Sequence, residues 1–460
     1  MDDRNTVLPR VTALLAGSAA RRVGFDLAAR KAALARLSAT ILAHREAIAN
    51  AVAEDLAKPA VEADLVEVLP VLSEIAHARR HLRGWMRPRR VMPTLMTLGT
   101  SAALYPQPKG VALVIAPWNF PFLLALSPVV SAIAAGNAVA VKPSELTPAT
   151  SALIAKILPQ ALPGLAEVFE GGPEISQALL AQPFDHIFFT GSPGVGKIVM
   201  AAAAKNLTPV TLELGGKSPV VLGEDADIAR AAKWIAWGKV VNAGQICVAP
   251  DHVYAPEAML PALSTAIKAE WQAMAKAGTT AIVNERHYAR LTALLADASA
   301  KGAQVEPLGP DRPEALQMSA RLLTGTTAEM AISSEEIFGP LLPLIPYRDL
   351  SDPIAAINAG PKPLTLYAFG GADLVARLRA ETSSGSLGVN LTIMPFIHAN
   401  LPFGGIGNSG IGAAHGRMGF DSFSHLKPVM QNRFTLLPLM FPPYTGRVKR
   451  LKDLVLRLVR

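Results

Sequence analysis

Short runs of consecutive apolar residues recur along this chain and alternate with segments of helical periodicity. The run Gly-Val-Ala-Leu-Val-Ile over residues 110–115 precedes a predicted helix over 123–135 and a second apolar run over 138–141. A strand without polar alternation is typical of a parallel sheet that helices cover on both faces. The alternation continues to a predicted strand at 386–390, so the sequence predicts an α/β fold with two domains that join near residue 215.

Helices and a hairpin are predicted outside these runs. Residues 24–56 and 60–86 carry apolar side chains at helical spacing, so each is predicted to form one long helix. Residues 91–108 have few charges and are predicted to form extended strands in a projecting hairpin. Near the end of the chain, residues 434–443 are apolar, and residues 447–460 have the pattern of a basic amphipathic helix.

Composition argues against several classes of protein. The 460 residues include one cysteine, so no intrachain disulfide can form and a reducing, cytoplasmic setting is expected. The apolar stretch over 111–141 is interrupted by prolines, glycine and asparagine, so it is not predicted to span a membrane. The formal net charge is +8, but basic and acidic residues are mixed, and no nucleic-acid partner is predicted.

The single cysteine, Cys247, lies among small and polar residues in a segment that Pro250 closes as a turn would. A lone cysteine is often an inert residue of the core. On a turn it can instead act as a nucleophile, provided that its pKa is lowered or a base removes its proton. The residues around Cys247 favour the reactive interpretation only if other parts of the chain supply a base and an oxyanion donor.

Polar residues follow several predicted strands, where open α/β sheets place their ligand sites. Asn119 lies between two prolines after the first strand, and Lys-Pro-Ser-Glu follows the second at 142–145. A glycine-rich turn at 190–197 precedes a helix predicted over 199–204 and could hold a phosphate on backbone N–H groups. It lacks the hydroxyl of a P-loop, because Ile198 follows the lysine, and a plain turn remains an alternative.

Glu213 lies within the predicted strand 210–214, although strands of parallel sheets rarely carry acids. Two explanations are open. The strand could lie at the edge of its sheet, or the carboxyl could be partly buried with a raised pKa and act as a general base.

Seven motifs occur in the order typical of the aldehyde dehydrogenase superfamily, which the chain resembles from its first long helix to about residue 430. They are Pro-Trp-Asn-Phe-Pro at 117–121, Lys-Pro-Ser-Glu at 142–145, Phe-Thr-Gly-Ser at 189–192, Glu-Leu-Gly-Gly-Lys at 213–217, Gly-Gln-Ile-Cys at 244–247, Glu-Ile-Phe-Gly-Pro at 336–340 and Pro-Phe-Gly-Gly at 402–405. Phe-Asp-His-Ile at 184–187 and His-Gly at 415–416 are similar to the class 3 branch, which includes fatty aldehyde and coniferyl aldehyde dehydrogenases.

The resemblance implies covalent catalysis and a nicotinamide cofactor. Cys247 would attack the aldehyde, Asn119 would hold the oxyanion together with the Cys247 N–H, and Glu213 would activate the water that releases the acid. No metal ligand is expected. NAD⁺ is favoured, since the Glu145 carboxylate would repel a 2′-phosphate, although NADP⁺ is compatible with the class 3 branch. The implied cofactor-binding residues are Ile115, Trp118, Lys142, Ser144, Glu145, Gly191, Ser192, Gly215, Glu336 and Phe338.

The resemblance also implies an organisation of the chain. Residues 1–87 and 109–214 would form a Rossmann-like cofactor domain, 215–410 a catalytic α/β domain, 88–108 and 415–433 the strands of a homodimer arm, and 434–460 a tail. The apolar loop at 390–399 favours an aliphatic or aromatic aldehyde as substrate. For the basic helix in the tail two roles stay open: covering the substrate tunnel or a partner subunit, or attaching peripherally to an anionic membrane through residues 444–460.

Three other functions remain as alternatives. A cysteine hydrolase would need a histidine base beside Cys247, and the nine histidines lie outside the seven motifs. A non-catalytic NAD-binding protein would be expected to lack Cys247, Glu213 or Asn119, and all three are present. An acylating, CoA-dependent enzyme is disfavoured because Glu213 points to water as the acyl acceptor.

Overall fold

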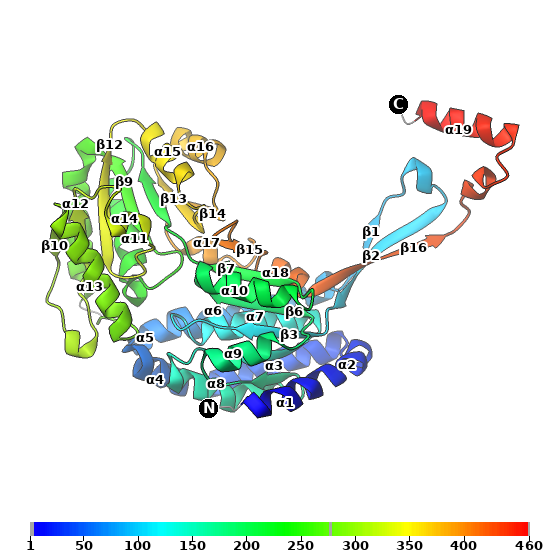
Figure 1. The fold of residues 1–460 in the computed structure, drawn as a ribbon, viewed down its shortest axis with the longest axis horizontal. Helices are drawn as coiled ribbons and strands as arrows, with labels where there is room; N and C mark the ends of the chain where they lie inside the picture. Colours follow the sequence, from blue (N-terminus) through cyan, green and yellow to red (C-terminus); the bar gives the residue numbers. More distant parts are fainter. Residues whose placement is uncertain (1–3, 276–277, 459–460) are drawn as a thin grey trace.

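A computed structural model describes residues 4–275 and 278–458 and contains three β-sheets (Figure 1). The first sheet has six strands in the order β15-β7-β6-β3-β4-β5, of which only β15 is antiparallel to its neighbour. Its strands are β3 (Val111–Ile115), β4 (Ala138–Lys142), β5 (Ala166–Val168), β6 (His186–Gly191), β7 (Val210–Leu214) and β15 (Gly410–Ile411).

Helices cover both faces of the first sheet, which explains why its strands are apolar throughout. In β3, Ala112 and Val114 pack into one core, whereas Val111, Leu113 and Ile115 pack into another on the opposite face. The helices of the first core include α3 (Leu27–Ala43), α4 (Arg45–Leu56), α6 (Leu69–Trp85), α7 (Leu123–Ala135) and α8 (Pro148–Ala161), and those of the second include α1 (Arg4–Ala16), α9 (Pro173–Leu180) and α10 (Pro193–Ala204).

The second sheet has seven strands in the order β10-β11-β12-β9-β8-β13-β14, parallel except for β10. Its strands are β8 (Pro219–Leu222), β9 (His252–Pro256), β10 (Gln304–Pro307), β11 (Arg321–Thr324), β12 (Leu341–Tyr347), β13 (Thr365–Phe369) and β14 (Ser386–Val389). The main helices around it are α11 (Ile228–Val240), α12 (Leu260–Met274), α13 (Glu285–Ala300), α14 (Ala331–Ser334), α15 (Ser351–Ala359) and α16 (Ala372–Glu381). The chain passes from the first sheet to the second between Leu214 and Pro219.

The third sheet is an antiparallel arm that projects from the body of the molecule (Figure 1). It consists of β1 (Arg89–Val91), β2 (Thr100–Pro108) and β16 (Ser424–Asn432), so the predicted hairpin at 91–108 is confirmed. Beyond β16 the chain continues to α19 (Gly446–Leu458), at the far end of the arm. The last two residues of the predicted tail helix, 459–460, lie outside the described residues.

Several predicted elements differ in the structure. The helix predicted over 24–56 is divided into α3 and α4 at His44, and Asp26 caps the start of α3 by accepting the Ala29 N–H. No helix was predicted at α9, which begins at Pro173, where proline occupies a first-turn position that needs no N–H. α10 begins at Pro193 rather than 199. The smaller helices are α2 (Ser18–Gly24), α5 (Ala60–Ala63), α17 (Met394–Ile397) and α18 (Gly416–Ser422).

One further feature of the fold bears on the site. Residues Asp64–Val68, between α5 and α6, form a π-helical turn, a form found frequently at functional sites.

Within residues 4–275 and 278–458, every helix is too short or too polar to cross a lipid bilayer.

Candidate active site

The loop that carries Cys247 is built from backbone conformations that few residues adopt. Between α11 and β9, Asn242 and Ala243 have φ angles of 52°, and Gly244 has φ 70°. A Cβ on Gly244 would lie 2.4 Å from the Gly339 carbonyl oxygen, so only glycine fits there. The Gln245 side chain fixes the loop by donating to the Asn242 and Ala281 carbonyl oxygens (3.0 and 2.9 Å).

Cys247 is half-buried where three cavities meet. Burial, together with the charges of the nearby Glu336 and Glu213 carboxyls, raises the pKa of its thiol to about 12. The thiol is therefore protonated near pH 7, and it needs a proton acceptor before it can attack a carbonyl as a thiolate.

Asn119 lies directly against the cysteine loop. It is buried, and its side-chain Nδ2 donates to the Gln245 carbonyl oxygen at 3.0 Å. Its own carbonyl oxygen accepts from Asn242 Nδ2 at 2.8 Å. Because an amide nitrogen carries two hydrogens, the second N–H of Asn119 can donate to an oxygen that develops beside Cys247.

A buried ion pair holds the Asn119 loop in place. Lys58 Nζ lies 2.6 Å from Glu67 Oε1 and 4.4 Å from the centroid of the Phe120 ring, and both charged side chains are fully buried. Glu67 Oε2 accepts the N–H groups of Phe122 and Leu123 at the start of α7 (3.2 and 2.9 Å). Glu67 belongs to the π-helical turn, so that turn positions the carboxylate which anchors the loop.

Glu213 lies in the interior of the first sheet, with β6 on one side and β15 on the other. The edge-strand explanation is therefore wrong. Both carboxyl oxygens are buried, and neither has a hydrogen-bond partner among the described residues. This burial raises the pKa of Glu213 well above its usual value, so the carboxyl stays neutral to a higher pH than an ordinary glutamate and becomes a base above that raised pKa.

A polar cavity of about 240 Å³ brings most of the predicted site residues together. Nine of them line it, namely Trp118, Asn119, Gly191, Ser192, Glu213, Gly215, Cys247, Glu336 and Phe338. The remaining four, Ile115, Lys142, Ser144 and Glu145, do not line this cavity. They lie at the ends of β3 and β4, where Ile115 pairs with Lys142 in the sheet register and Lys142 forms an ion pair with Glu145.

One end of the polar cavity fits a phosphate-bearing cofactor. Ser192 caps α10 by accepting the Val195 N–H at 3.4 Å, so this helix begins at the cavity. The first N–H groups of a helix and its positive dipole end favour anions. A Cβ on Gly191 would lie 2.5 Å from the Phe189 ring, so a larger residue here would disturb the turn.

The other end of the polar cavity has a buried carboxyl without a full set of partners. Glu336 Oε1 has no hydrogen-bond partner among the described residues, and burial raises the pKa of this side chain to about 7. Glu336 Oε2 would lie 2.2 Å from a Cβ on Gly215, so glycine is required for this approach. A ribose hydroxyl is the kind of donor that such a carboxyl can bind, and the residues therefore fit a nicotinamide cofactor.

Two residues that line the polar cavity lie outside all seven sequence motifs. Arg290 donates to the Glu336 and Ile337 carbonyl oxygens (3.1 and 2.5 Å) and so holds the loop that presents Glu336. The His287 ring packs 5.2 Å from Trp118. Burial and the charge of Arg290 lower the pKa of His287 to about 4, so this histidine, although it shares a cavity with Cys247, is a weak base.

A second, apolar cavity of about 60 Å³ reaches Cys247 from the α6–α7 side. Its other lining residues are all apolar: Leu65, Val66, Pro70, Phe120, Leu123, Leu124, Trp237, Val241, Ile246, Val248, Ile393, Phe396 and Ile397. A third and smaller cavity, of about 30 Å³, is lined by Glu213, Cys247 and His415, and it is called the inner cavity below. Cys247 is thus accessible from a polar side and from an apolar side.

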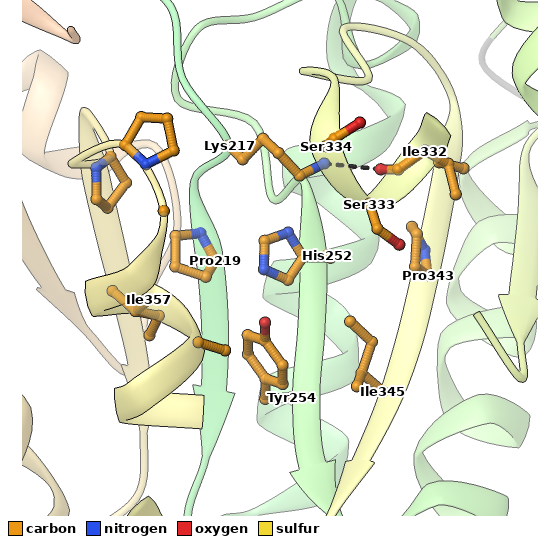
Figure 2. A pocket seen from close by; sticks show the side chains of 14 residues that line it. Lys217, Pro219, His252, Tyr254, Ile332, Ser333, Ser334, Pro343, Ile345 and Ile357 are labelled. Atoms are coloured by element: carbon orange, nitrogen blue, oxygen red, sulfur yellow. Dashed lines mark hydrogen bonds between the residues drawn. The ribbon is translucent and has the colours of Figure 1, made fainter. Parts of the chain in front are cut away.

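A separate cavity of about 310 Å³ lies over β8, β9 and β12 (Figure 2). Cys247, Glu213 and Asn119 are not among the residues that line it. Its lysine, Lys217, donates to Asp251 Oδ1 at 2.6 Å and to the Ile332 carbonyl oxygen at 2.8 Å. Those contacts occupy the Lys217 amino group. Because this cavity also lacks the predicted catalytic residues, the candidate active site is assigned to the junction of the three cavities at Cys247.

Known proteins resemble this chain over most of its length. Residues 16–429 match the model of the aldehyde dehydrogenase family. The chain is 41% identical over 423 residues to aldehyde dehydrogenase family 3 member H1 of Arabidopsis thaliana, covering 90% of this chain and 87% of that one. It is 42% identical to the probable coniferyl aldehyde dehydrogenase of Caulobacter vibrioides, covering 89% and 88%.

Solved structures give the same result. The substrate-bound state of Staphylococcus aureus AldH superposes with a TM-score of 0.92 at 37% identity, covering 99% of this chain and all of that one. An aldehyde dehydrogenase of Mycobacterium tuberculosis complexed with NAD⁺ superposes with a TM-score of 0.86 at 26% identity, covering 95% and 92%. The predicted fold and the predicted class 3 resemblance are therefore confirmed.

Proposed function

The chain belongs to the aldehyde dehydrogenase family, and on that premise we propose that it oxidises an apolar aldehyde, aliphatic or aromatic, to the carboxylic acid. The observation that carries the proposal is the meeting of the polar and apolar cavities at Cys247. An aldehyde in the apolar cavity would place its carbonyl carbon at the thiol, because the lining residues offer no charged group to bind elsewhere.

Each residue at the junction of the cavities has a separate role in the reaction. Cys247 adds to the carbonyl carbon while its thiol proton passes to a water molecule, which gives a thiohemiacetal. The Asn119 amide and the Cys247 N–H donate to the oxygen as its negative charge develops, a contribution of roughly 3–4 kcal/mol per donor in comparable sites. A nicotinamide held by the residues of the polar cavity would supply the hydride acceptor, and loss of hydride from the thiohemiacetal carbon would leave a thioester on Cys247.

Glu213 then acts as the general base. It lines both the polar cavity and the inner cavity at Cys247, and its oxygens have no hydrogen-bond partner among the described residues. A water molecule between the carboxylate and the thioester would give its proton to Glu213 as it attacks. This position supports water, rather than CoA, as the acyl acceptor.

NAD⁺ is the proposed cofactor in preference to NADP⁺. Glu145 is exposed at the end of β4 and forms an ion pair with Lys142, itself buried. The pair suits the hydroxyls of a ribose, whereas a 2′-phosphate would meet the carboxylate charge. NADP⁺ can still bind if the Glu145 side chain turns toward solvent.

Aldehyde oxidation is tested by NADH or NADPH formation at 340 nm with a panel of aldehydes. Apolar aliphatic and aromatic aldehydes are expected to give the highest kcat/KM, and a charged semialdehyde the lowest, because no charged group lines the apolar cavity. NAD⁺ is expected to outperform NADP⁺. A preference for charged aldehydes would contradict the substrate assignment, and stimulation by CoA would contradict hydrolysis.

The arm supports a homodimer. Apolar side chains that are exposed on it and just beyond it include Met92, Leu98, Met430, Phe434 and Leu436. β1 and β16 are the edges of its sheet, and an exposed apolar edge is a surface that proteins normally cover. A second copy of the chain is the partner that this surface would take.

Light scattering of the full chain and of a chain ending at residue 443 tests the dimer. Both are expected to have twice the mass of one chain, because β1, β2 and β16 are intact in each, and a monomeric full chain would contradict the proposal.

Sedimentation with anionic vesicles separates the two roles of α19. Pelleting of the full chain alone would assign the helix to a membrane, and two soluble proteins would assign it to the partner subunit or the substrate cavity.

A further inference from the structure

The inner cavity behind Glu213 is large enough for water but not for a substrate. Its volume is about 30 Å³, and a buried water needs about 10–15 Å³. Glu213, Cys247 and His415 all line it, together with Ser127 and Ser131 of α7. During turnover the polar cavity holds cofactor and the apolar cavity holds aldehyde, so of the three cavities at Cys247 this one is left for water.

His415 is held at this cavity by unusual backbone geometry. Its φ angle is 66°, in the left-handed region that β-carbon-bearing residues rarely adopt. The next residue must be glycine, because a Cβ on Gly416 would lie 2.0 Å from the Ala399 carbonyl oxygen. The rings of Phe396 and Phe403 pack against the imidazole, with centroids at 4.9 and 5.7 Å. The ring is therefore fixed in position.

A buried carboxyl lies beside this ring. His415 Nδ1 is 3.5 Å from Glu74 Oε2, and Glu74 is buried in α6. Ser127 and Ser131 also donate to the Glu74 carboxyl. His415 Nδ1 faces Glu74, and the His415 side chain also lines the inner cavity, which leaves Nε2 as the second ring nitrogen for proton exchange.

The same face of α6 continues toward the surface. Glu74, His77 and His81 follow at helical spacing, so they share one side of the helix. The rings of His77 and His81 are 4.2 Å apart, and His81 is exposed. Burial and His81 lower the pKa of His77, while Glu74 opposes that shift, which indicates that carboxyl and imidazole are close.

Building on the proposed function, we propose that Glu74 and His415 carry protons away from Glu213 through the inner cavity. Oxidation of one aldehyde by NAD⁺ and water yields one carboxylate, one NADH and two protons. The thiol proton passes to water in the inner cavity as the C–S bond forms. The attacking water later gives one proton to Glu213, and the acid product returns its remaining proton to the leaving thiolate. Cavity water passes the two released protons in turn to His415 Nε2, and Nδ1–H passes each one to Glu74, from which the His77 and His81 face of α6 leads to the surface.

Other charged groups surround this route and set its pH dependence. Glu213 and Cys247 face the pair across the cavity, Arg80 lies on α6 near His77, and Arg417 with Asp421 lies on α18. Asp421 pairs with Arg417 at 3.0–3.1 Å and with Arg89 at 3.6 Å.

The experiment compares His415→Gln and Glu74→Gln with wild type, and uses His425→Gln, an exposed histidine on β16, as the matched control. If the relay operates, the two variants form NADH in a first-turnover burst of normal amplitude. Their steady-state kcat falls about 10- to 100-fold, within the range for removal of a proton-transfer group. Added imidazole restores part of kcat in His415→Gln, and the kcat–pH profile shifts in both.

Two results would overturn the relay. One is an unchanged kcat and pH profile in both variants. The other is a loss of burst amplitude in proportion to kcat, with no imidazole rescue, which would mean a structural role. Failure of the proposed function is distinguishable, because wild type and His425→Gln would then also form no NADH.

Discussion

Cys247→Ala is expected to lower kcat/KM for every aldehyde by roughly 10⁴-fold or more, the scale seen when a covalent nucleophile is removed. In the described part of the chain, Cys247 and Leu124 line all three of the polar, apolar and inner cavities, and leucine is not a nucleophile, so no neighbouring side chain can take over the attack. The rate of NADH formation measures the loss.

The control for Cys247→Ala is cofactor binding. Alanine is small and leaves the Gln245 and Asn119 contacts of the loop in place, so NAD⁺ should still quench tryptophan fluorescence through Trp118. Retained binding without activity supports a nucleophile. Substantial aldehyde oxidation by the variant would contradict the account, because the reaction would then not pass through a thioester.

Glu213→Gln is expected to lower steady-state kcat by about 10²- to 10⁴-fold, since it removes the base that activates water. Its effect differs from that of the cysteine variant. Hydride transfer precedes hydrolysis, so the variant should still form a burst of one NADH per subunit. Stopped-flow absorbance at 340 nm separates the burst from the steady state, and Glu314→Gln, an exposed acid, is the matched control.

The pH dependence of kcat follows from the burial of Glu213. Because burial raises the pKa of this carboxyl, it is protonated below that pKa and cannot act as a base there. Wild-type kcat is therefore expected to rise with pH through the raised pKa and then level off. In Glu213→Gln this plateau should disappear, and the residual rate should keep rising with hydroxide concentration. A wild-type kcat that falls over the same range would contradict the assignment.

Much of the fold followed from the sequence because burial on two faces leaves a simple pattern. β3 and β4 are apolar at every position up to the terminal Lys142, since helices cover both faces of the first sheet. Local breaks were harder to predict. The kink at His44 interrupts a continuous apolar stripe, and α9 begins at Pro173 directly after two glycines, a sequence that also suits a turn.

The candidate site was only partly predictable for a related reason. Cys247, Asn119 and Glu213 lie in short motifs, whereas their supports are contacts between residues far apart in the chain. Lys58 and Glu67 hold the Asn119 loop from 61 and 52 residues away, and neither lies in a motif. His287, Arg290 and the Glu74–His415 contact were missed in the same way, because helical periodicity does not show which face meets the site.

Glu213 shows where pattern reasoning stopped short. An acid within a strand of a parallel sheet had two explanations, and only the strand order could separate them. β15, two residues long, pairs with β7 and removes the edge position. What remains is a buried carboxyl without partners among the described residues, an arrangement that is costly to stability and common at catalytic sites.

The most direct test is to trap the covalent intermediate. Glu213→Gln is mixed with an apolar aldehyde and NAD⁺, quenched in acid during the burst, and analysed by intact-protein and peptide mass spectrometry. The account predicts a mass increase equal to one acyl group, located on the peptide that contains Cys247 and absent when NAD⁺ is left out. Burst formation of NADH without an acyl group on that peptide would contradict it.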